Sequence, residues 1–338
     1  MHSRSFTRLI LLGAATVAAL AAAALGVAGR AAGATLGTGI VDVTTNLGYQ
    51  NASAAGTGMV LTASGEVLTN NHVIRGATTI RVIEPSSGHS YTATVVGYSV
   101  TSDIAVLQLT GASHLHTVSL GNSSTVRLGQ RVTAAGNAGG ANGKPITAAG
   151  KVTALGQSIV ASDEGGLSEQ LVGLIRTDAA LQPGDSGGPL LNAAGRVIGM
   201  DTAASTGFQF QSSTQAFAIP INRALATAKQ IVAGQASATV HIGSTPFLGL
   251  SIAAPAAGPG GTSGLSVAQV VSGSPADQAG IVAGDTLTAV DGQPVSSYDG
   301  LSALLLAHNA GETVTLDWVD LAGVAQTATV QTAVGPPQ

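Results

Sequence analysis

The chain of 338 residues has no cysteine and few charged or aromatic side chains. The absence of cysteine excludes thiol catalysis, disulfide bonds and cysteine-ligated zinc. Only 9% of the residues are charged, and the 13 Lys and Arg side chains accompany a formal net charge of -4. Such a chain lacks the cationic surface that holds a nucleic-acid backbone, so nucleic acid is not an expected partner.

What the chain has in abundance is glycine and small or β-branched residues. It contains 46 Gly, and Val, Thr and Ala recur throughout. This composition favours β-rich folds with tight turns over helical bundles. The length allows two compact domains behind a targeting segment.

The N-terminus has the features of an export signal. Arg4 and Arg8 precede an uncharged apolar run over residues 9–29, and Ala-Gly-Ala at 32–34 provides small residues for cleavage. Residues 1–34 are therefore predicted to be a signal peptide, which implies a secreted or cell-envelope protein. The alternative is an uncleaved N-terminal membrane anchor, since about 20 uncharged residues can span a bilayer.

Short apolar runs separated by Gly, Asn and Ser turns predict a barrel or sandwich between residue 35 and about residue 213. Residues 59–62 and 67–69 are expected to form a hairpin. Further strands are expected at 79–83, 91–98, 104–109, 131–135, 150–155 and 196–200. After Pro220, apolar residues recur at helical spacing up to Gly234, which predicts one helix.

The region after residue 246 alternates short strands with Gly and Pro turns, and the polar stretch 234–246 before it is expected to be a linker. Two helices are expected in it. Ser274 and Pro275 are suited to the cap and first position of a short helix, and residues 297–309 to a longer one.

The segment Gly184-Asp-Ser-Gly-Gly-Pro-Leu190 carries the strongest chemical indication. A serine attacks an acyl group only when a base takes its proton, and the tetrahedral intermediate needs donors aimed at its oxyanion. The sequence nominates Ser186 as the nucleophile, and the amides of Gly184 and Ser186 as the oxyanion hole. A glycine-rich turn that contains a serine by chance is the alternative.

Two further residues can complete a catalytic triad with Ser186. His72 directly follows a predicted strand and can act as the base. Asp103 opens another strand, where its carboxylate can accept the imidazole N–H and fix the tautomer. Without these neighbours, each would be an ordinary structural residue.

The segments Thr-Asn-Asn-His-Val-Ile at 69–74 and Ser-Asp-Ile-Ala-Val-Leu at 102–107, together with the serine motif, resemble the HtrA branch of the chymotrypsin-like serine proteases. The resemblance implies a mainly β fold, a chymotrypsin-like double β-barrel over residues 35–235. It also implies the catalytic order His72, Asp103, Ser186 and hydrolysis of peptide bonds.

The same resemblance places Ala180 in the S1 pocket. Ala180 has no charge, which implies cleavage after small or medium apolar residues. Thr202 and Ala203 are expected to pair with the substrate backbone. Two positions depart from the family, which mostly has Asn at the places of Asp185 and Asp201; Asp185 is expected to find a partner other than a newly cut N-terminus.

Residues 236–338 resemble the PDZ domains of bacterial proteases, through Phe247-Leu-Gly-Leu250, the stretch 270–276 and the stretch 279–285. The resemblance implies that Phe247, Leu248, Gly249 and Leu250 receive the C-terminal carboxylate of a peptide, which would add as a strand. Leu301, Leu304 and Leu305 face either the peptide groove or, as we expect, the core. The alternative is a PDZ fold that only packs against the protease.

The predicted function is thus a serine endopeptidase acting on unfolded or exposed polypeptide segments, with the PDZ domain recruiting peptides. A peptide-binding or chaperone-like module with little proteolysis, and an amidase or esterase, are the alternatives. No cofactor or metal is expected, because the His114 and His116 pair has no third ligand nearby in sequence. The family resemblance implies a homo-oligomer, because HtrA proteases commonly form trimers. Those trimers are usually built from aromatic residues in the N-terminal segment, and residues 35–48 of this chain have none.

Overall fold

The computed structural model describes residues 37–137, 143–162, 168–202, 215–253 and 263–338. The predicted signal peptide lies outside these residues. Within them, no helix combines the length and the apolar character that crossing a membrane would require.

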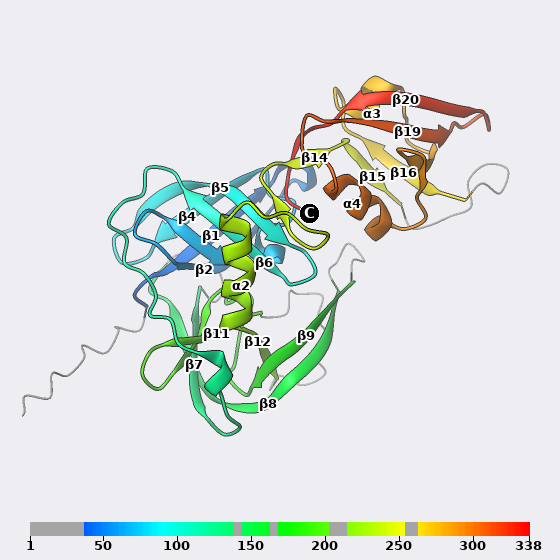
Figure 1. Cartoon of the computed structure of the whole chain (residues 1–338). Coiled ribbons are helices and arrows are strands. Elements are labelled where there is room, and N and C mark those ends of the chain that lie inside the picture. Colours follow the sequence, from blue (N-terminus) through cyan, green and yellow to red (C-terminus); the bar gives the residue numbers. More distant parts are fainter. Residues whose placement is uncertain (1–36, 138–142, 163–167, 203–214, 254–262) are drawn as a thin grey trace, which may run out of the picture. The chain divides into compact units, whose positions relative to one another are not determined.

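The first half of the predicted protease region is a closed antiparallel sheet (Figure 1). Its strands follow the order β5-β4-β1-β2-β3-β6, and β5 also pairs with β6, which closes the ring. Alternating apolar residues fill its interior, including Val43, Val67 and Leu107, none of them exposed. The strands are β1 (Ile40–Leu47), β2 (Ala52–Val60), β3 (Glu66–Thr69), β4 (Thr79–Glu84), β5 (His89–Ser99) and β6 (Ile104–Leu109).

The second half is a closed barrel in the order β10-β11-β12-β9-β8-β7. Its strands are β7 (Arg131–Gly136), β8 (Ile146–Ser162), β9 (Ser168–Thr177), β10 (Pro189–Asn192), β11 (Val197–Asp201) and β12 (Ala216–Pro220). One apolar cluster joins the two barrels, because Met59, Leu68 and Val106 of the first pack with Leu174 and Ile219 of the second. The predicted double β-barrel is therefore confirmed.

The predicted helix after Pro220 is α2 (Ile221–Val232), and it packs against β5 and β6 of one barrel and β11 and β12 of the other (Figure 1). Its apolar face buries Ile221, Ala224, Ala228 and Ile231, at helical spacing. Gly234 follows with φ +67°, a conformation that ends helices readily. Single 3-10 turns occur at η1 (Gly48–Gln50) and η2 (Ser123–Thr125).

The stretch predicted as a linker contains structure that its polar composition does not reveal. His241 and Ile242 form β13, which pairs with β5 of the first barrel. The ring of His241 lies 5.2 Å from that of Tyr98, and both side chains are buried. Burial against a barrel strand, which composition cannot report, turns this part of the expected linker into sheet.

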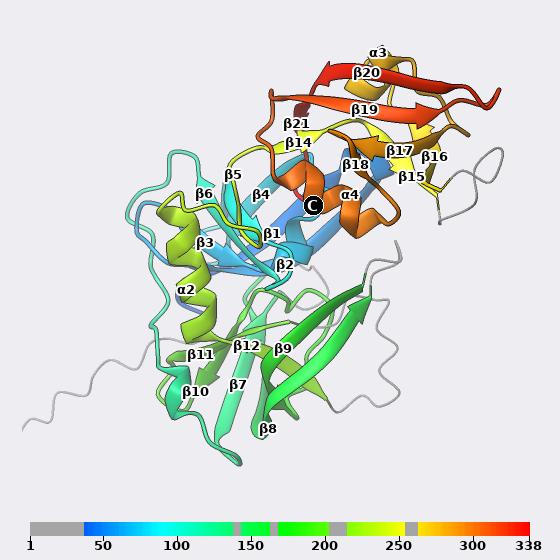
Figure 2. The ribbon, with the colours of Figure 1, turned by 45° about the vertical axis from the view of Figure 1, so that its right-hand side comes forward.

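The C-terminal region is a twisted antiparallel sheet with two helices, as expected for a PDZ domain (Figure 2). The sheet order is β15-β16-β17-β19-β20, with β18 beside β17. The strands of this sheet are β15 (Leu250–Ile252), β16 (Leu265–Val270), β17 (Thr286–Val290), β18 (Gln293–Pro294), β19 (Thr313–Val319) and β20 (Ala325–Gln331). A separate two-stranded sheet pairs β14 (Thr245–Phe247) with β21 (Ala333–Gly335).

Both predicted helices of this region begin at the predicted caps. The Ser274 hydroxyl accepts a hydrogen bond from the amide of Asp277 at 3.3 Å at the start of α3 (Pro275–Ala279). Ser297 does the same for Gly300 at 3.1 Å at the start of α4 (Tyr298–Leu306). Leu301 and Leu305 are buried in the core and Leu304 packs against it, so the expectation of core over groove is confirmed.

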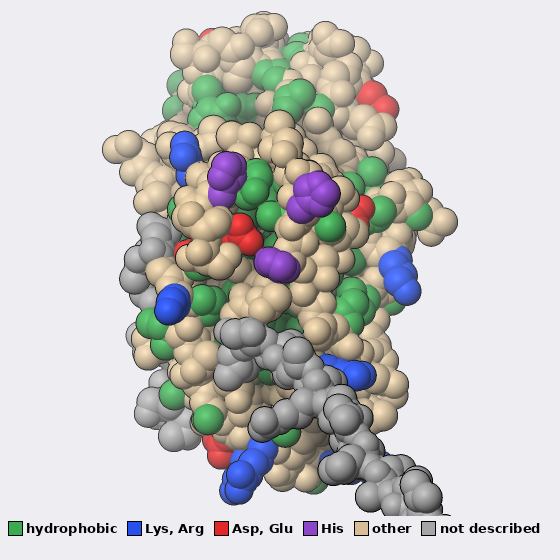
Figure 3. Space-filling view, turned by 90° about the vertical axis from the view of Figure 1, so that its left-hand side faces the viewer, with side chains coloured by type: hydrophobic (Ala, Val, Ile, Leu, Met, Phe, Trp, Pro, Cys, Tyr) green, Lys and Arg blue, Asp and Glu red, His purple; other side chains and the backbone are tan. Residues whose placement is uncertain are grey.

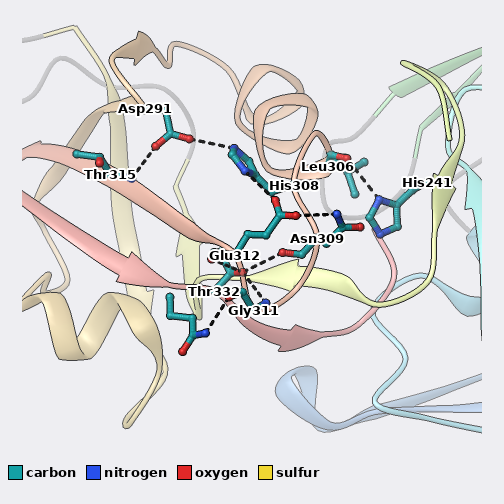
Figure 4. A network of polar contacts seen from close by, with 10 residues as sticks. His241, Asp291, Leu306, His308, Asn309, Gly311, Glu312, Thr315 and Thr332 are labelled. Carbon is teal, nitrogen blue, oxygen red and sulfur yellow. Dashed lines mark hydrogen bonds and ion pairs between the residues drawn. The ribbon is translucent and has the colours of Figure 1, made fainter.

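An exposed polar network fixes the turn between α4 and β19 (Figure 4). The His308 ring lies 2.9 Å from Asp291 and 3.4 Å from Glu312. The Asn309 amide donates to Glu312 at 2.8 Å, and hydrogen bonds from Asn309 lower the pKa of that carboxyl. Because solvent screens these contacts, each contributes little to stability.

Candidate active site

His72 belongs to the first sequence motif, 69–74, and its ring contacts Asp103 of the second motif, 102–107. β3 ends at Thr69, and one helical turn, α1 (Asn71–Ile74), follows at once. The turn places the His72 ring against Asp103, with Nδ1 3.0 Å from Oδ1 and 2.9 Å from Oδ2. The side chain of His72 is 25% exposed, whereas that of Asp103 is 1% exposed. One edge of the imidazole is thus held by a buried carboxylate while the ring remains accessible.

Asp103 is held by several contacts that converge on it. Its backbone has a φ of +53°, which is uncommon for a residue other than glycine. The Asn70 side-chain amide donates to its carbonyl at 2.9 Å. Its carboxylate accepts from the His72 backbone amide at 3.0 Å and from the Thr202 hydroxyl at 3.1 Å. A carboxylate with this many donors is fixed in position and can itself fix the imidazole.

Ser186 lies in the loop between β9 and β10 and is 5% exposed. Gly187 follows it with φ +85°, and a Cβ there would lie 2.1 Å from the Thr57 carbonyl oxygen. Only glycine can hold that conformation at so close an approach. Gly187 therefore allows the loop to pass close to the backbone of β2.

Thr57 on β2 is the residue that anchors this loop, and sequence reasoning missed it. Its amide donates to the Ser186 carbonyl at 2.8 Å, and its hydroxyl donates to the Gly184 carbonyl at 2.7 Å. The same hydroxyl accepts from the Asn137 amide at 2.8 Å. Thr57 is fully buried. Thr57 is flanked by Gly56 and Gly58, and glycines within a strand often mark a place where another backbone approaches closely. These two glycines were the one signal in the sequence that could have pointed to Thr57.

The predicted oxyanion-hole donors belong to the same loop. Gly184 has a φ of +100°, a backbone conformation that favours glycine. The amide of Asp185 donates to the Gln182 carbonyl at 3.0 Å, and the amide of Gly188 donates to the Asp185 carbonyl at 2.9 Å. Together with the two bonds from Thr57, these contacts fix the peptide planes around Gly184 and Ser186.

Of the three substrate-contacting residues predicted in the protease region, the structure describes Ala180 and Thr202. Ala180 is exposed, between the buried Ala179 and the serine loop. Thr202 directly follows β11, and its hydroxyl bonds to Asp103, a contact that the sequence did not predict. Ala203 lies outside the described residues.

Buried carboxylates give the site an unusual electrostatic environment. Asp201 at the end of β11 is fully buried, and burial raises its pKa well above the ordinary value, with a further rise from the charge of Asp185. Burial also raises the pKa of Asp185, whose Oδ2 accepts from the Gln182 amide at 2.8 Å. Asp185 thus has a partner within its own loop, as the sequence analysis expected.

The predicted peptide-binding loop of the C-terminal region connects β14 to β15. Phe247 ends β14, and Leu248 and Gly249 form the turn. The Leu248 carbonyl accepts from the Ala276 amide at 2.9 Å, and the Gly249 carbonyl from the Val271 amide at 2.7 Å. β15, which begins at Leu250, lies at the edge of the sheet.

No group of three or more His, Asp or Glu side chains within the described ranges is arranged to hold a metal ion. On the face drawn in Figure 3, Lys and Arg side chains stand apart from one another among polar and apolar surface. The distribution on this face agrees with the low positive charge of the sequence.

Comparison with known proteins assigns both regions. The trypsin-like peptidase domain model matches residues 56–200, and the PDZ domain model matches residues 266–320. Serine protease PepD of Mycobacterium tuberculosis is 35% identical over 309 residues, which is 86% of this chain and 63% of PepD. The chain belongs to the HtrA-type serine proteases.

Other members of this family match similarly. Periplasmic serine endoprotease DegP of Escherichia coli is 36% identical over 79% of this chain and 54% of its own length. The solved HtrA-type protease AlgW with tripeptide is 29% identical with a TM-score of 0.50, covering 89% of this chain and 95% of AlgW. The chain spans less than two thirds of the length of curated relatives such as PepD and DegP.

Proposed function

We propose that the protein is a serine endopeptidase that hydrolyses peptide bonds through an acyl-enzyme. The observation that carries this proposal is the contact of His72 Nδ1 with the buried carboxylate of Asp103, at 2.9 Å, beside a glycine-supported loop that bears Ser186. Membership of the HtrA family agrees with it.

The proposed roles follow from this geometry. With its Nδ1–H donated to Asp103, the neutral imidazole has an acceptor at Nε2 that can take the Ser186 hydroxyl proton. Asp103 then stabilises the imidazolium, and the Thr202 hydroxyl keeps the carboxylate in place. Ser186 Oγ attacks the carbonyl carbon, and the amides of Gly184 and Ser186 stabilise the oxyanion. His72 returns the proton to the leaving amine, and water hydrolyses the acyl-enzyme.

For specificity, we propose small or medium apolar residues on the acyl side of the cleaved bond. Ala180 has no charge to pair with Lys or Arg of a substrate. The chain after β11, through Thr202 and Ala203, is proposed to pair with the substrate backbone. Unfolded or exposed segments are the proposed substrates, because only an extended chain can add in this way.

We further propose that residues 35–235 form the protease domain and residues 236–338 a PDZ domain that recruits peptides. The matched ranges of the two family models lie within these bounds. The edge strand β15 and the loop through Phe247, Leu248 and Gly249 support strand addition by a peptide. With residues 1–34 as signal peptide, the setting would be extracytoplasmic protein quality control or processing, which agrees with the periplasmic location of DegP.

The proposed activity is tested with Ser186→Ala in the full chain. The variant should lose fluorophosphonate labelling and casein cleavage, with about a thousandfold or greater fall in rate, because the nucleophile is gone. Ser272→Ala, at an exposed serine of the C-terminal region, is the matched control and should behave as the native protein. Equal labelling and cleavage in all three proteins would exclude Ser186 as the nucleophile. Absence of both from the native protein would favour the peptide-binding or chaperone-like alternative.

A further inference from the structure

Two buried carboxyl groups lie behind the serine loop and take no part in the roles assigned above. Asp185 is 4% exposed and directly precedes Ser186, and Asp201 is fully buried at the end of β11, directly before Thr202. Each is therefore covalently adjacent to a residue of the proposed site.

The backbones of the two aspartates are tied together through the loop. The Gly188 amide donates to the Asp185 carbonyl at 2.9 Å, and the Asp201 amide donates to the Gly188 carbonyl at 2.7 Å. The Gly187 amide donates to the Asp201 carbonyl at 2.8 Å. Burial raises the pKa of Asp201 well above its ordinary value, and the charge of Asp185 raises it further.

Among the residues that the structure describes, neither carboxyl group has a cationic partner. Both side-chain oxygens of Asp201 and Oδ1 of Asp185 are buried there without a hydrogen bond from a donor. The Gln182 amide does donate to the pair, at 2.8 Å to Asp185 Oδ2. Two ionised carboxylates in this position would be costly, because charge is taken out of water without compensation and the like charges repel.

The strands beside β11 offer no charge to neutralise the pair, and β7, which approaches Asp185 at Gly136, has its one charged residue, Arg131, exposed at its far end. Those beside β11 are β10, Pro-Leu-Leu-Asn, and β12, Ala-Phe-Ala-Ile-Pro, neither with a charged side chain. His72 and Asp103 lie beyond Thr202, and they are paired with each other. A further buried carboxyl, that of Asp42, lies on β1 opposite Thr57, and burial alone raises its pKa to about 6.

We propose that Asp185 and Asp201 share one proton, and that this neutralised carboxyl pair positions the serine loop for the proposed reaction. A protonated Asp201 donates to Oδ1 of Asp185, while Asp185 Oδ2 keeps its bond from Gln182. The pair thereby links the end of β11 to the turn that carries Gly184 and Ser186. Both aspartates are positioning residues, and their effect on catalysis rests on the function proposed above.

The pair has a definite signature in the dependence of stability on pH. Since the folded-state pKa lies above the unfolded one, the folded state holds a proton that the unfolded chain releases. The stability that this proton contributes is complete below the ordinary pKa of aspartate. It is lost as the pH rises through the raised folded value. In Asp201→Asn no proton is needed, and the amide can still donate to Asp185.

The test uses the full-length chain and three readouts: the infrared band of a buried protonated carboxyl, the thermal unfolding midpoint across pH, and the pH profile of peptide cleavage. The native protein should show the band at pH 7, and Asp201→Asn should lack it and keep a flatter stability profile. Once the proton dissociates, native cleavage should fall about tenfold per pH unit, and this alkaline fall should be absent from Asp201→Asn. Asp178→Asn, at an exposed carboxylate, should match the native protein in all three.

Asp185→Asn gives a second route if Asp201→Asn folds poorly, since its amide oxygen can still accept from Gln182 while its amide donates to Asp201. The proposal is overturned if the native protein lacks the carboxyl band at pH 7, or if both Asn variants keep the native profiles. A band that appears only after exchange into chelator and choline buffer would assign the neutralising charge to a metal cation and also overturn it. The band and the unfolding midpoint do not depend on proteolysis, so this failure is separable from failure of the proposed function.

Discussion

At the scale of single residues, the contacts that position the site come largely from side chains outside the recognisable motifs. Thr57 contacts the serine loop on both sides of Asp185, through its amide and its hydroxyl. Asn70 and Thr202 hold Asp103 from opposite ends, one at its carbonyl and one at its carboxylate. None of these residues ionises near neutral pH, so their contribution is geometric.

Replacing Thr57 by Val should therefore lower catalysis more than it lowers folding. The variant keeps the side-chain volume and the amide bond to Ser186, but the Gly184 carbonyl and the Asn137 amide lose their partner. We expect kcat to fall about tenfold to a hundredfold, and stability to fall by about 1–3 kcal/mol. Steady-state cleavage of a peptide substrate and urea unfolding measure the two effects.

Thr44→Val is the matched control on the neighbouring strand, because its hydroxyl makes an exposed bond to the Arg81 carbonyl at 3.2 Å. It should change neither kcat nor stability by a measurable amount. A Thr57→Val enzyme with native kcat would show that the loop holds its shape without the hydroxyl.

At the scale of elements, the serine loop is a closely packed connection between β9 and β10 that the surrounding strands hold in place. Gly187 is its tightest point, since an added Cβ would meet the Thr57 carbonyl oxygen at 2.1 Å and the Thr69 hydroxyl at 2.5 Å. Neither contact can relax easily, because both partners lie in buried strands that pair with neighbours.

Gly187→Ala is expected to destabilise the protein by about 3 kcal/mol or more and to abolish fluorophosphonate labelling of Ser186. Gly111→Ala separates backbone strain from close approach, since Gly111 also has a positive φ, +72°, but a Cβ added there would have no atom within 4 Å. That control should cost about 1 kcal/mol and keep full labelling. Equal losses in both variants would mean that φ alone sets the requirement.

At the scale of the whole molecule, the chain joins a proposed catalytic region to a sheet with an available edge. The proposed peptide would pair with β15, which is the edge strand of this sheet. The turn at Gly249 allows the chain to pass Ser274 closely, because a Cβ there would lie 2.1 Å from the Ser274 Cβ.

A peptide with a free C-terminal carboxylate is expected to bind this region at least about tenfold more tightly than the same peptide ending in an amide. Fluorescence anisotropy of labelled peptides with the Ser186→Ala chain measures this without cleavage. Gly249→Ala should weaken the carboxylate peptide, because the turn can no longer form. Absence of binding by either peptide would favour a PDZ fold that serves only for packing.

The sequence by itself determined the short strands of a barrel or sandwich and the two helices of the C-terminal region, because apolar runs, turn residues and caps such as Ser274 and Ser297 act locally. The double barrel, the PDZ domain and the family were implied by the resemblance of contiguous motifs. It also nominated His72, Asp103 and Ser186, because glycine spacing and strand ends constrain them locally.

Only the tertiary structure decided which distant residues support them. Thr57 meets Gly184 across 127 positions of chain, and Thr202 meets Asp103 across 99. Hydrogen bonds between segments so far apart leave no periodic trace in the sequence. The same holds for the burial of Asp201 and for the pairing of β13 with β5, because burial depends on what the rest of the chain places around a residue.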